Sequence, residues 1–212
     1  MDCEKPQGPR QICRYNNGTG DQLDVPLGTT AFVSGKKMFE ILSLELKKSS
    51  HPIKVQIRPS SLRRDVKSNG LGIKVENMEQ PRDQLPSFEE SKIKTFPLLS
   101  ESPVTGNLHL QVHPCGAEKL IIEPLSKSSS FTVKTMEIRE IFYKLQQPGI
   151  SPDLVYRHNW KAKDLCLFHN RGVLHTVIGA FKEDQDQAFW QCNMASSDEP
   201  LGPDADDLQR FI

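Results

Sequence analysis

The chain has 212 residues, of which 36% are hydrophobic and 25% charged, enough for a single globular domain with its own core. The charges of its 27 basic and 27 acidic residues cancel, so the composition does not indicate electrostatic binding to nucleic acid or to an anionic membrane. No apolar run approaches membrane-spanning length, and residues 1–20 are too polar for a signal peptide. The five cysteines are scattered and form no CxxC pair. We therefore expect a cytoplasmic protein with reduced thiols and no structural zinc.

The N-terminal quarter alternates short strands with turns. Residues 11–15 and 22–25 are strand candidates, and the turn-forming stretch 16–20 between them predicts a β-hairpin. Residues 29–33 are again rich in β-forming side chains. After them, Ser34 opens a predicted helix whose apolar spacing runs through positions 38, 41 and 42 to Glu45.

The middle of the chain, residues 48–104, has the least regular pattern. Residues 55–58 predict one short strand, while prolines, serine pairs and a mixed charge run dominate the remainder. Because structureless connections of this length are uncommon inside a domain, we expect residues 60–104 to form a poorly ordered, lid-like insertion.

Two histidines follow on a predicted strand at residues 108–112. His109 and His113 would share one face at the two-residue period of a strand, which makes a metal pair conceivable. No carboxylate or third histidine accompanies them at ligand spacing, so the pattern favours ordinary strand histidines. Farther on, residues 120–122 predict a strand and residues 136–146 the clearest helix, whose apolar stripe is typical of core packing.

Residues 164–177 organise the C-terminal third. Residues 164–168 are a short apolar run, residues 169–172 have turn chemistry, and residues 173–177 resemble a second strand, so together they predict a hairpin. His175 stands among apolar neighbours on the second strand, where an imidazole needs either a hydrogen-bond partner or a metal. The residues alone leave both interpretations open.

The C-terminus continues with one more strand and a tail. Residues 188–194 predict the last strand, and residues 196–212 are acidic and contain proline and glycine, which predicts a tail. We therefore expect one domain over residues 1–212, mainly β with helices.

Several segments resemble a known enzyme family. Residues 160–176 read WKAKDLCLFHNRGVLHT and resemble the C-terminal metal-histidine motif of the taurine dioxygenase-like (TauD-like) family, the Fe(II)- and 2-oxoglutarate-dependent dioxygenases. Residues 11–20, 24–35 and 110–114 are similar, in the same order, to the fungal α-ketoglutarate-dependent xanthine dioxygenases within that family. The resemblance implies a double-stranded β-helix (jelly roll), Fe(II) and 2-oxoglutarate as cofactors, and hydroxylation of xanthine to urate in purine catabolism.

The same resemblance assigns roles to five positions. His175 matches the distal iron ligand, and Thr30 matches the threonine that binds 2-oxoglutarate. Gln191 and Asn193 match the family's purine-contacting residues. Gln187 stands where the family has the arginine that pairs with the far carboxylate of 2-oxoglutarate, so an uncharged amide replaces a charge-assisted bidentate contact.

One required feature is absent from the 212 residues: no His-x-Asp or His-x-Glu sequence occurs, although iron sites of this class use two histidines and a carboxylate. In the family that pair lies upstream of the segment matching residues 11–20, so we expect an incomplete, N-terminally truncated jelly roll. Two interpretations stay open. The chain is either a dioxygenase of this family that acts on a purine-like small molecule and is inactive as written, or a degenerate, non-catalytic paralogue that binds a small molecule or a protein. Gln187 and Trp190, which replace family arginines, favour the second, and the oligomeric state stays open.

Overall fold

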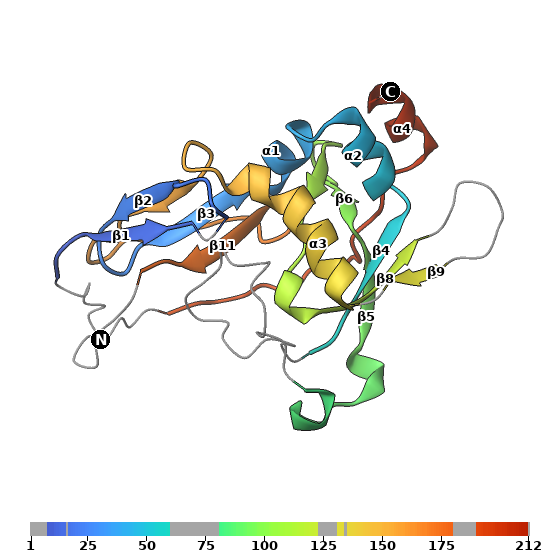
Figure 1. Ribbon diagram of the computed structural model, residues 1–212, viewed down its shortest axis with the longest axis horizontal. Coiled ribbons are helices and arrows are strands. Elements are labelled where there is room, and N and C mark those ends of the chain that lie inside the picture. The colour runs from blue at the N-terminus through green and yellow to red at the C-terminus, as the bar shows by residue number, and fades with distance from the viewer. Residues whose placement is uncertain are drawn as a thin grey trace.

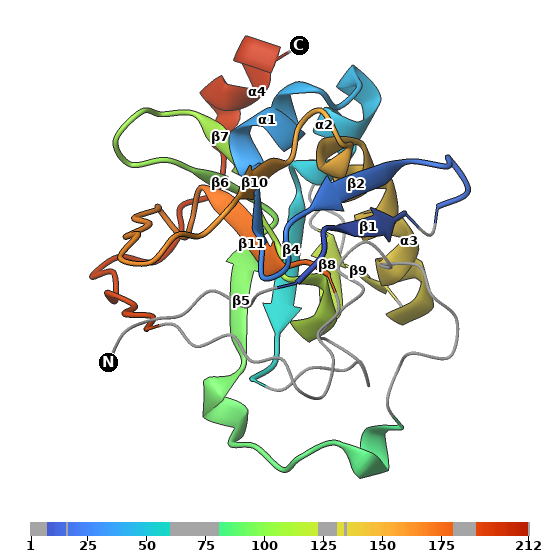
Figure 2. The same cartoon turned by 90° about the vertical axis from the view of Figure 1, so that its left-hand side faces the viewer.

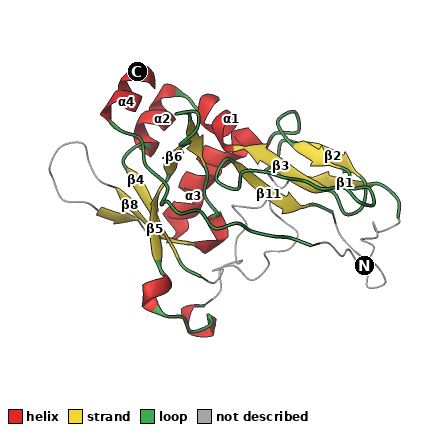
Figure 3. Ribbon diagram, turned by 180° about the vertical axis from the view of Figure 1, so that it is seen from behind, coloured by secondary structure: helices red, strands yellow, loops and turns green. Residues whose placement is uncertain are grey.

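A computed structural model describes residues 8–15, 17–59, 81–122, 131–133, 135–179 and 190–211. The strands within these ranges form four antiparallel sheets. Figures 1 and 3 show β1, β2, β3 and β11 at one end of the molecule and β4, β5 and β8 at the other.

The first end contains a hairpin and a three-stranded sheet. The predicted hairpin is confirmed: β1 (Gln11–Arg14) pairs with β2 (Gln22–Val25). In the three-stranded sheet, β3 (Thr30–Ser34) is the central strand between β10 (Tyr156–His158) and β11 (Val173–Val177). Four consecutive residues of β3 are buried, so both faces of this strand are covered there.

The other end contains the remaining sheets. The larger has the strand order β5 (Lys94–Pro97), β4 (Ile53–Ile57), β8 (Ala117–Ile122), β9 (Phe131–Val133). The smaller joins β6 (Leu99–Glu101) to β7 (Leu108–Leu110). Val55 of β4 and Leu120 of β8 pair directly and are almost completely buried, so this pair anchors the core of this end.

Four α-helices in the described part of the chain pack around the sheets: α1 (Gly35–Glu40), α2 (Leu44–Ser50), α3 (Thr135–Gln146) and α4 (Ala205–Phe211). Short 3-10 turns are η1 (Arg82–Gln84), η2 (Glu90–Lys92), η3 (Pro114–Gly116) and η4 (Gln147–Ile150). Ser34 caps α1 as predicted, accepting the Lys37 N–H at 3.2 Å. The predicted helix through Glu45 is divided in two, because Ser43 caps a separate helix, α2, by accepting the Leu46 N–H at 3.3 Å.

The helix predicted at 136–146 is confirmed as α3, and its apolar stripe lies in the core. Ile138 and Phe142 are fully buried, and Leu145 is 2% exposed. No helix within the described ranges is long and apolar enough to cross a membrane.

Two strand predictions near the C-terminus are wrong. Residues 164–168 form no strand, and β11 pairs with β3 instead of with them. Leu165 and Leu167 are 92% and 84% exposed, so in this structure their burial does not drive pairing. Residues 190–194 also form no strand, while residues 188–189 lie outside the described residues.

Two predictions of irregular structure are also corrected. Within the expected insertion at 60–104, residues 94–97 and 99–101 form β5 and β6, because Leu98 and Leu99 are buried in the core. Residues 60–80 of that insertion lie outside the described residues. The expected acidic tail contains α4, which packs beside α2 (Figure 2). The Asp204 carboxylate accepts the Asp207 N–H at 2.9 Å and so stabilises the start of α4.

Candidate functional site

The candidate iron ligand lies on one face of the three-stranded sheet. His175 of β11 and Tyr156 of β10 are both paired with Phe32 of β3. Side chains directly opposite each other in antiparallel strands project from the same face, so these three residues share it. Ala31 and Val33 alternate with them on β3 and are buried in the core on the opposite face.

His175 is held by aromatic neighbours and is not enclosed by them. Its ring is stacked on Phe32 with 5.8 Å between ring centroids, and the Phe168 ring lies 4.8 Å away. The side chain is exposed overall, but contact with these rings partly buries it, and this burial lowers the pKa of His175 below its ordinary value. The imidazole is therefore neutral at pH 7, the form that can donate a lone pair to a metal.

Thr30 lies on the same face as His175, because Val177, two residues farther along β11, pairs with Thr30. It is 6% exposed, and its hydroxyl oxygen accepts a hydrogen bond from the Trp160 indole at 2.9 Å. His158 packs edge-on against Trp160 at 4.3 Å and lies 3.4 Å from the Asp164 carboxylate. The hydrogen bond from Trp160 thus orients the Thr30 hydroxyl.

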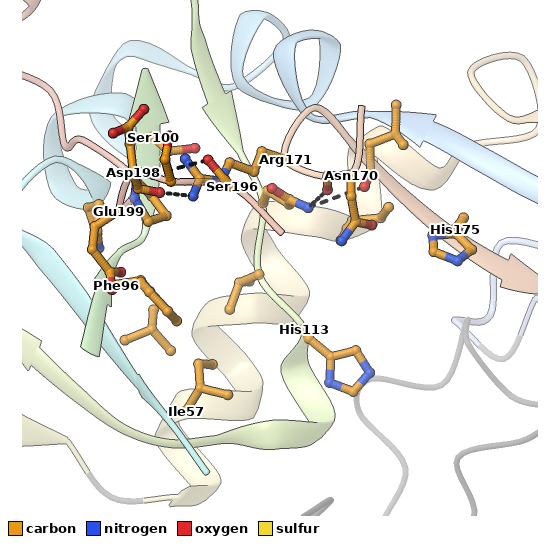
Figure 4. Close-up of a pocket in the computed structure, with 18 residues that line it drawn as sticks. Ile57, Phe96, Ser100, His113, Asn170, Arg171, His175, Ser196, Asp198 and Glu199 are labelled. Carbon is orange, nitrogen blue, oxygen red and sulfur yellow. Dashed lines mark hydrogen bonds between the residues drawn. The ribbon is translucent and has the colours of Figure 1, made fainter. Parts of the chain in front are cut away.

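A cavity of about 650 Å³ borders this face. Figure 4 shows His175 and His113 toward one end and Phe96 and Glu199 toward the other. Arg171 also lines the cavity and donates a hydrogen bond to the Asp198 carbonyl. Arg171 lies in the turn at 169–172 and is half-buried there.

The two histidines expected to share a strand face are separated. β7 ends at Leu110, so His109 lies in the strand, whereas His113 precedes η3. His109 lies against Gly172, while His113 lies against Gly116 and lines the cavity. Burial lowers the pKa of His113, and the nearby charge of Arg139 lowers it further. Its neutral imidazole can serve the cavity as a hydrogen-bonding group.

The remaining predicted residues do not join His175 in the described structure. Gln191 and Asn193 are exposed, and the Gln191 amide donates to the Asn193 side-chain oxygen at 3.0 Å. Neither lines the cavity. Gln187 lies outside the described residues.

Within the described part of the chain, no group of three or more His, Cys, Asp or Glu side chains is arranged to hold a metal ion. His175, the candidate ligand, therefore has no such group around it in these residues. A complete three-ligand iron site does not fit them.

Comparison with known proteins identifies the family. The model of the Taurine catabolism dioxygenase TauD, TfdA family matches residues 12–193. The chain belongs to this family. It is 47% identical to the α-ketoglutarate-dependent xanthine dioxygenase of Neurospora crassa over 98% of this chain and 49% of that protein. It is 44% identical to the enzyme with the same description from Schizosaccharomyces pombe, over 96% of this chain and 50% of that protein.

This TauD/TfdA chain spans about half the length of the curated relatives it matches. Among solved structures, it resembles AAD-2 in complex with Mn(II) and N-oxalylglycine, with a TM-score of 0.54 and 18% identity over 84% of this chain and 62% of that chain. At this identity the likeness concerns the fold. The predicted fold class, a mainly β jelly roll with helices, is confirmed.

Proposed function

We propose that this chain contributes His175 as one ligand of an Fe(II)/2-oxoglutarate dioxygenase site, and that the 212 residues do not by themselves turn over xanthine. One observation carries the proposal. The His175 imidazole is neutral, accessible and fixed on a strand. Among the described residues, however, no second and third metal-binding side chain lie near it. Family membership supports the class of chemistry.

The chain's own residues define what it can do in such a site. When bound, iron and 2-oxoglutarate supply the activation of dioxygen. His175 would hold the metal through one ring nitrogen, and the Thr30 O–H, oriented by Trp160, would donate to a carboxylate of 2-oxoglutarate. Gln187 lacks the charge of an arginine, which costs roughly 1.5–3 kcal/mol, or about ten- to hundredfold in affinity for 2-oxoglutarate.

The substrate we propose is a purine-like small molecule, with Gln191 and Asn193 as its contacts. Both side chains carry hydrogen-bond donors and acceptors that suit a purine edge. Two relatives of the chain are named xanthine dioxygenases. A cytoplasmic location and the lack of a nucleic acid or membrane partner stay predictions from composition.

Turnover is the first test. We expect the purified chain, given xanthine, 2-oxoglutarate, Fe(II) and ascorbate, to form urate and succinate no faster than free iron does. Gln187→Arg alone should recover nothing, because it repairs co-substrate binding and leaves the metal without the two ligands that should accompany His175. Stoichiometric urate that disappears in His175→Ala would overturn the proposal and would require a ligand set absent from the described residues.

Metal affinity is the second test. With a single imidazole ligand, water occupies most coordination positions of the iron. We therefore expect anaerobic Fe(II) titration to show no site of micromolar or tighter affinity at His175. Since His175 is exposed, His175→Ala should preserve the fold and serve as the matched control. A one-to-one micromolar Fe(II) site that this substitution abolishes would contradict the expectation.

A non-catalytic binding module is the second candidate function. The cavity of about 650 Å³ favours it, because apolar Ile57 and Phe96 and polar His113 and Arg171 all line it. Isothermal titration with xanthine and with 2-oxoglutarate, in the absence of metal, would measure such binding. Loss of the signal in His113→Ala would support this candidate, and the absence of heat with the unsubstituted chain would remove it for these two ligands.

A further inference from the structure

A second pair of histidines comes together at the turn that precedes β11. A β-carbon built on Gly172 would lie 3.4 Å from His109 Cε1, 3.5 Å from His109 Nδ1 and 3.4 Å from His169 Nδ1. Both imidazoles therefore flank the same small space, which is open because residue 172 has no side chain. The two histidines are 60 positions apart in sequence, so only the folded chain reveals the pair.

We propose that His109 and His169 form a two-imidazole site for a divalent transition metal such as Ni(II), Cu(II) or Zn(II). Imidazole nitrogen suits these metals, and two such donors with water completing the coordination shell form a minimal site. This pair replaces the His109–His113 pair that strand periodicity suggested. It does not include His175 and does not depend on the dioxygenase chemistry proposed above.

Backbone groups around the pair favour this role. His109 Nδ1 lies 3.4 Å from the Arg171 carbonyl oxygen, so when protonated it faces an acceptor and leaves Nε2 free for a metal. Metal-binding histidines commonly present their second ring nitrogen to a backbone carbonyl in this way. The Gly172 N–H donates to the His169 carbonyl at 2.8 Å, and the Gly172 carbonyl accepts from the Gly35 N–H at 2.9 Å. These bonds hold the turn that places His169 near His109 of β7.

The charges at the pair predict a modest rather than a tight site. Burial lowers the pKa of His109, so its ring is neutral and available at pH 7. Lys36 is close enough to act on His109, and its charge opposes a cation, although its ammonium lies 3.4 Å from the Glu40 carboxylate. Its replacement by glutamine should therefore strengthen metal binding, whereas the same change at Lys48 is a control.

The test adds Ni(II), with no other metal, to the 212-residue chain. Binding is measured by calorimetry and by NMR of the histidine ring protons. We expect one Ni(II) per chain, with broadening confined to the His109 and His169 signals. Loss of an outer-shell partner alone costs roughly 10–100-fold in metal affinity, so loss of either ligand should cost at least as much. His169→Ala is the decisive variant, because His169 is exposed and its loss should not disturb the core. Unchanged binding in His169→Ala, or binding lost in His113→Ala or His175→Ala, would overturn the proposal.

Discussion

Tyr15 joins the N-terminal hairpin to η4 and gives the chain a pH-dependent stability that can be measured. Its hydroxyl donates to the Ile150 carbonyl at 2.6 Å, and the residue is 6% exposed. Burial raises the pKa of Tyr15 to about 12, with Asp21 adding to the rise and Arg157 opposing it. The folded protein therefore resists ionising this side chain.

Tyr15→Phe removes both the hydrogen bond and the ionisable hydroxyl, and the pH dependence of the stability difference separates the two effects. At pH 7 the variant should be less stable by about 0.5–1.5 kcal/mol, because the Ile150 carbonyl loses its donor. Since the folded pKa lies above the unfolded value of about 10, the contribution of Tyr15 is complete below pH 10 and is lost as the pH rises toward 12. The two-unit gap amounts to roughly 1.4 kcal/mol by pH 11 and roughly 2.7 kcal/mol once the pH exceeds 12.

The wild-type advantage should therefore vanish between about pH 10 and pH 11 and then reverse. Urea unfolding of both proteins, followed by circular dichroism between pH 7 and pH 11, measures the difference directly. Taking the difference cancels the titration of the other tyrosines and of the lysines. A free-energy difference that stays constant over this range would refute the reasoning, because it would mean that Tyr15 ionises equally easily in both states.

Two further substitutions test packing near the site. Gly149→Ala should destabilise the fold by about 1–3 kcal/mol in urea unfolding, because the added carbon would overlap the buried Met38 side chain. The double variant with Met38→Ala should lose less stability than the sum of the losses in the two single variants. Trp160→Phe should cost about 0.5–1.5 kcal/mol by removing the hydrogen bond to Thr30, and an unchanged midpoint in thermal unfolding would show that the bond contributes nothing.

Elements that depend on neighbouring residues could be predicted from the sequence. The turn-forming sequence at 16–20 predicts the β1–β2 hairpin, and the spacing of Ile138, Phe142 and Leu145 predicts the buried face of α3. The Ser34 cap likewise marks the start of α1. In each case the deciding interactions lie within a few positions along the chain, so a local pattern carries the information.

Strand partnership could not be predicted in the same way. The turn at 169–172 is real, since the Gly172 N–H donates to the His169 carbonyl at 2.8 Å. However, β11 pairs with β3, whose residues lie about 140 positions earlier, and not with residues 164–168. Turn chemistry fixes where the chain reverses, whereas burial of β3 between two partners decides which strands pair, and that information is distributed over the whole chain.

The same distinction explains the candidate site. The motif around His175 predicted a candidate ligand, but its surroundings come from tertiary structure: Phe32 of β3 stacks on its ring because strand pairing brings the two opposite each other, and burial lowers the pKa of His175. Under the proposed function, the number of ligands then limits metal binding, because no second and third candidate ligand lie with His175 in the described residues. Iron affinity in such a site grows with each preoriented donor. A substitution that acts on 2-oxoglutarate, such as Gln187→Arg, should therefore change nothing measurable until two further ligands accompany His175.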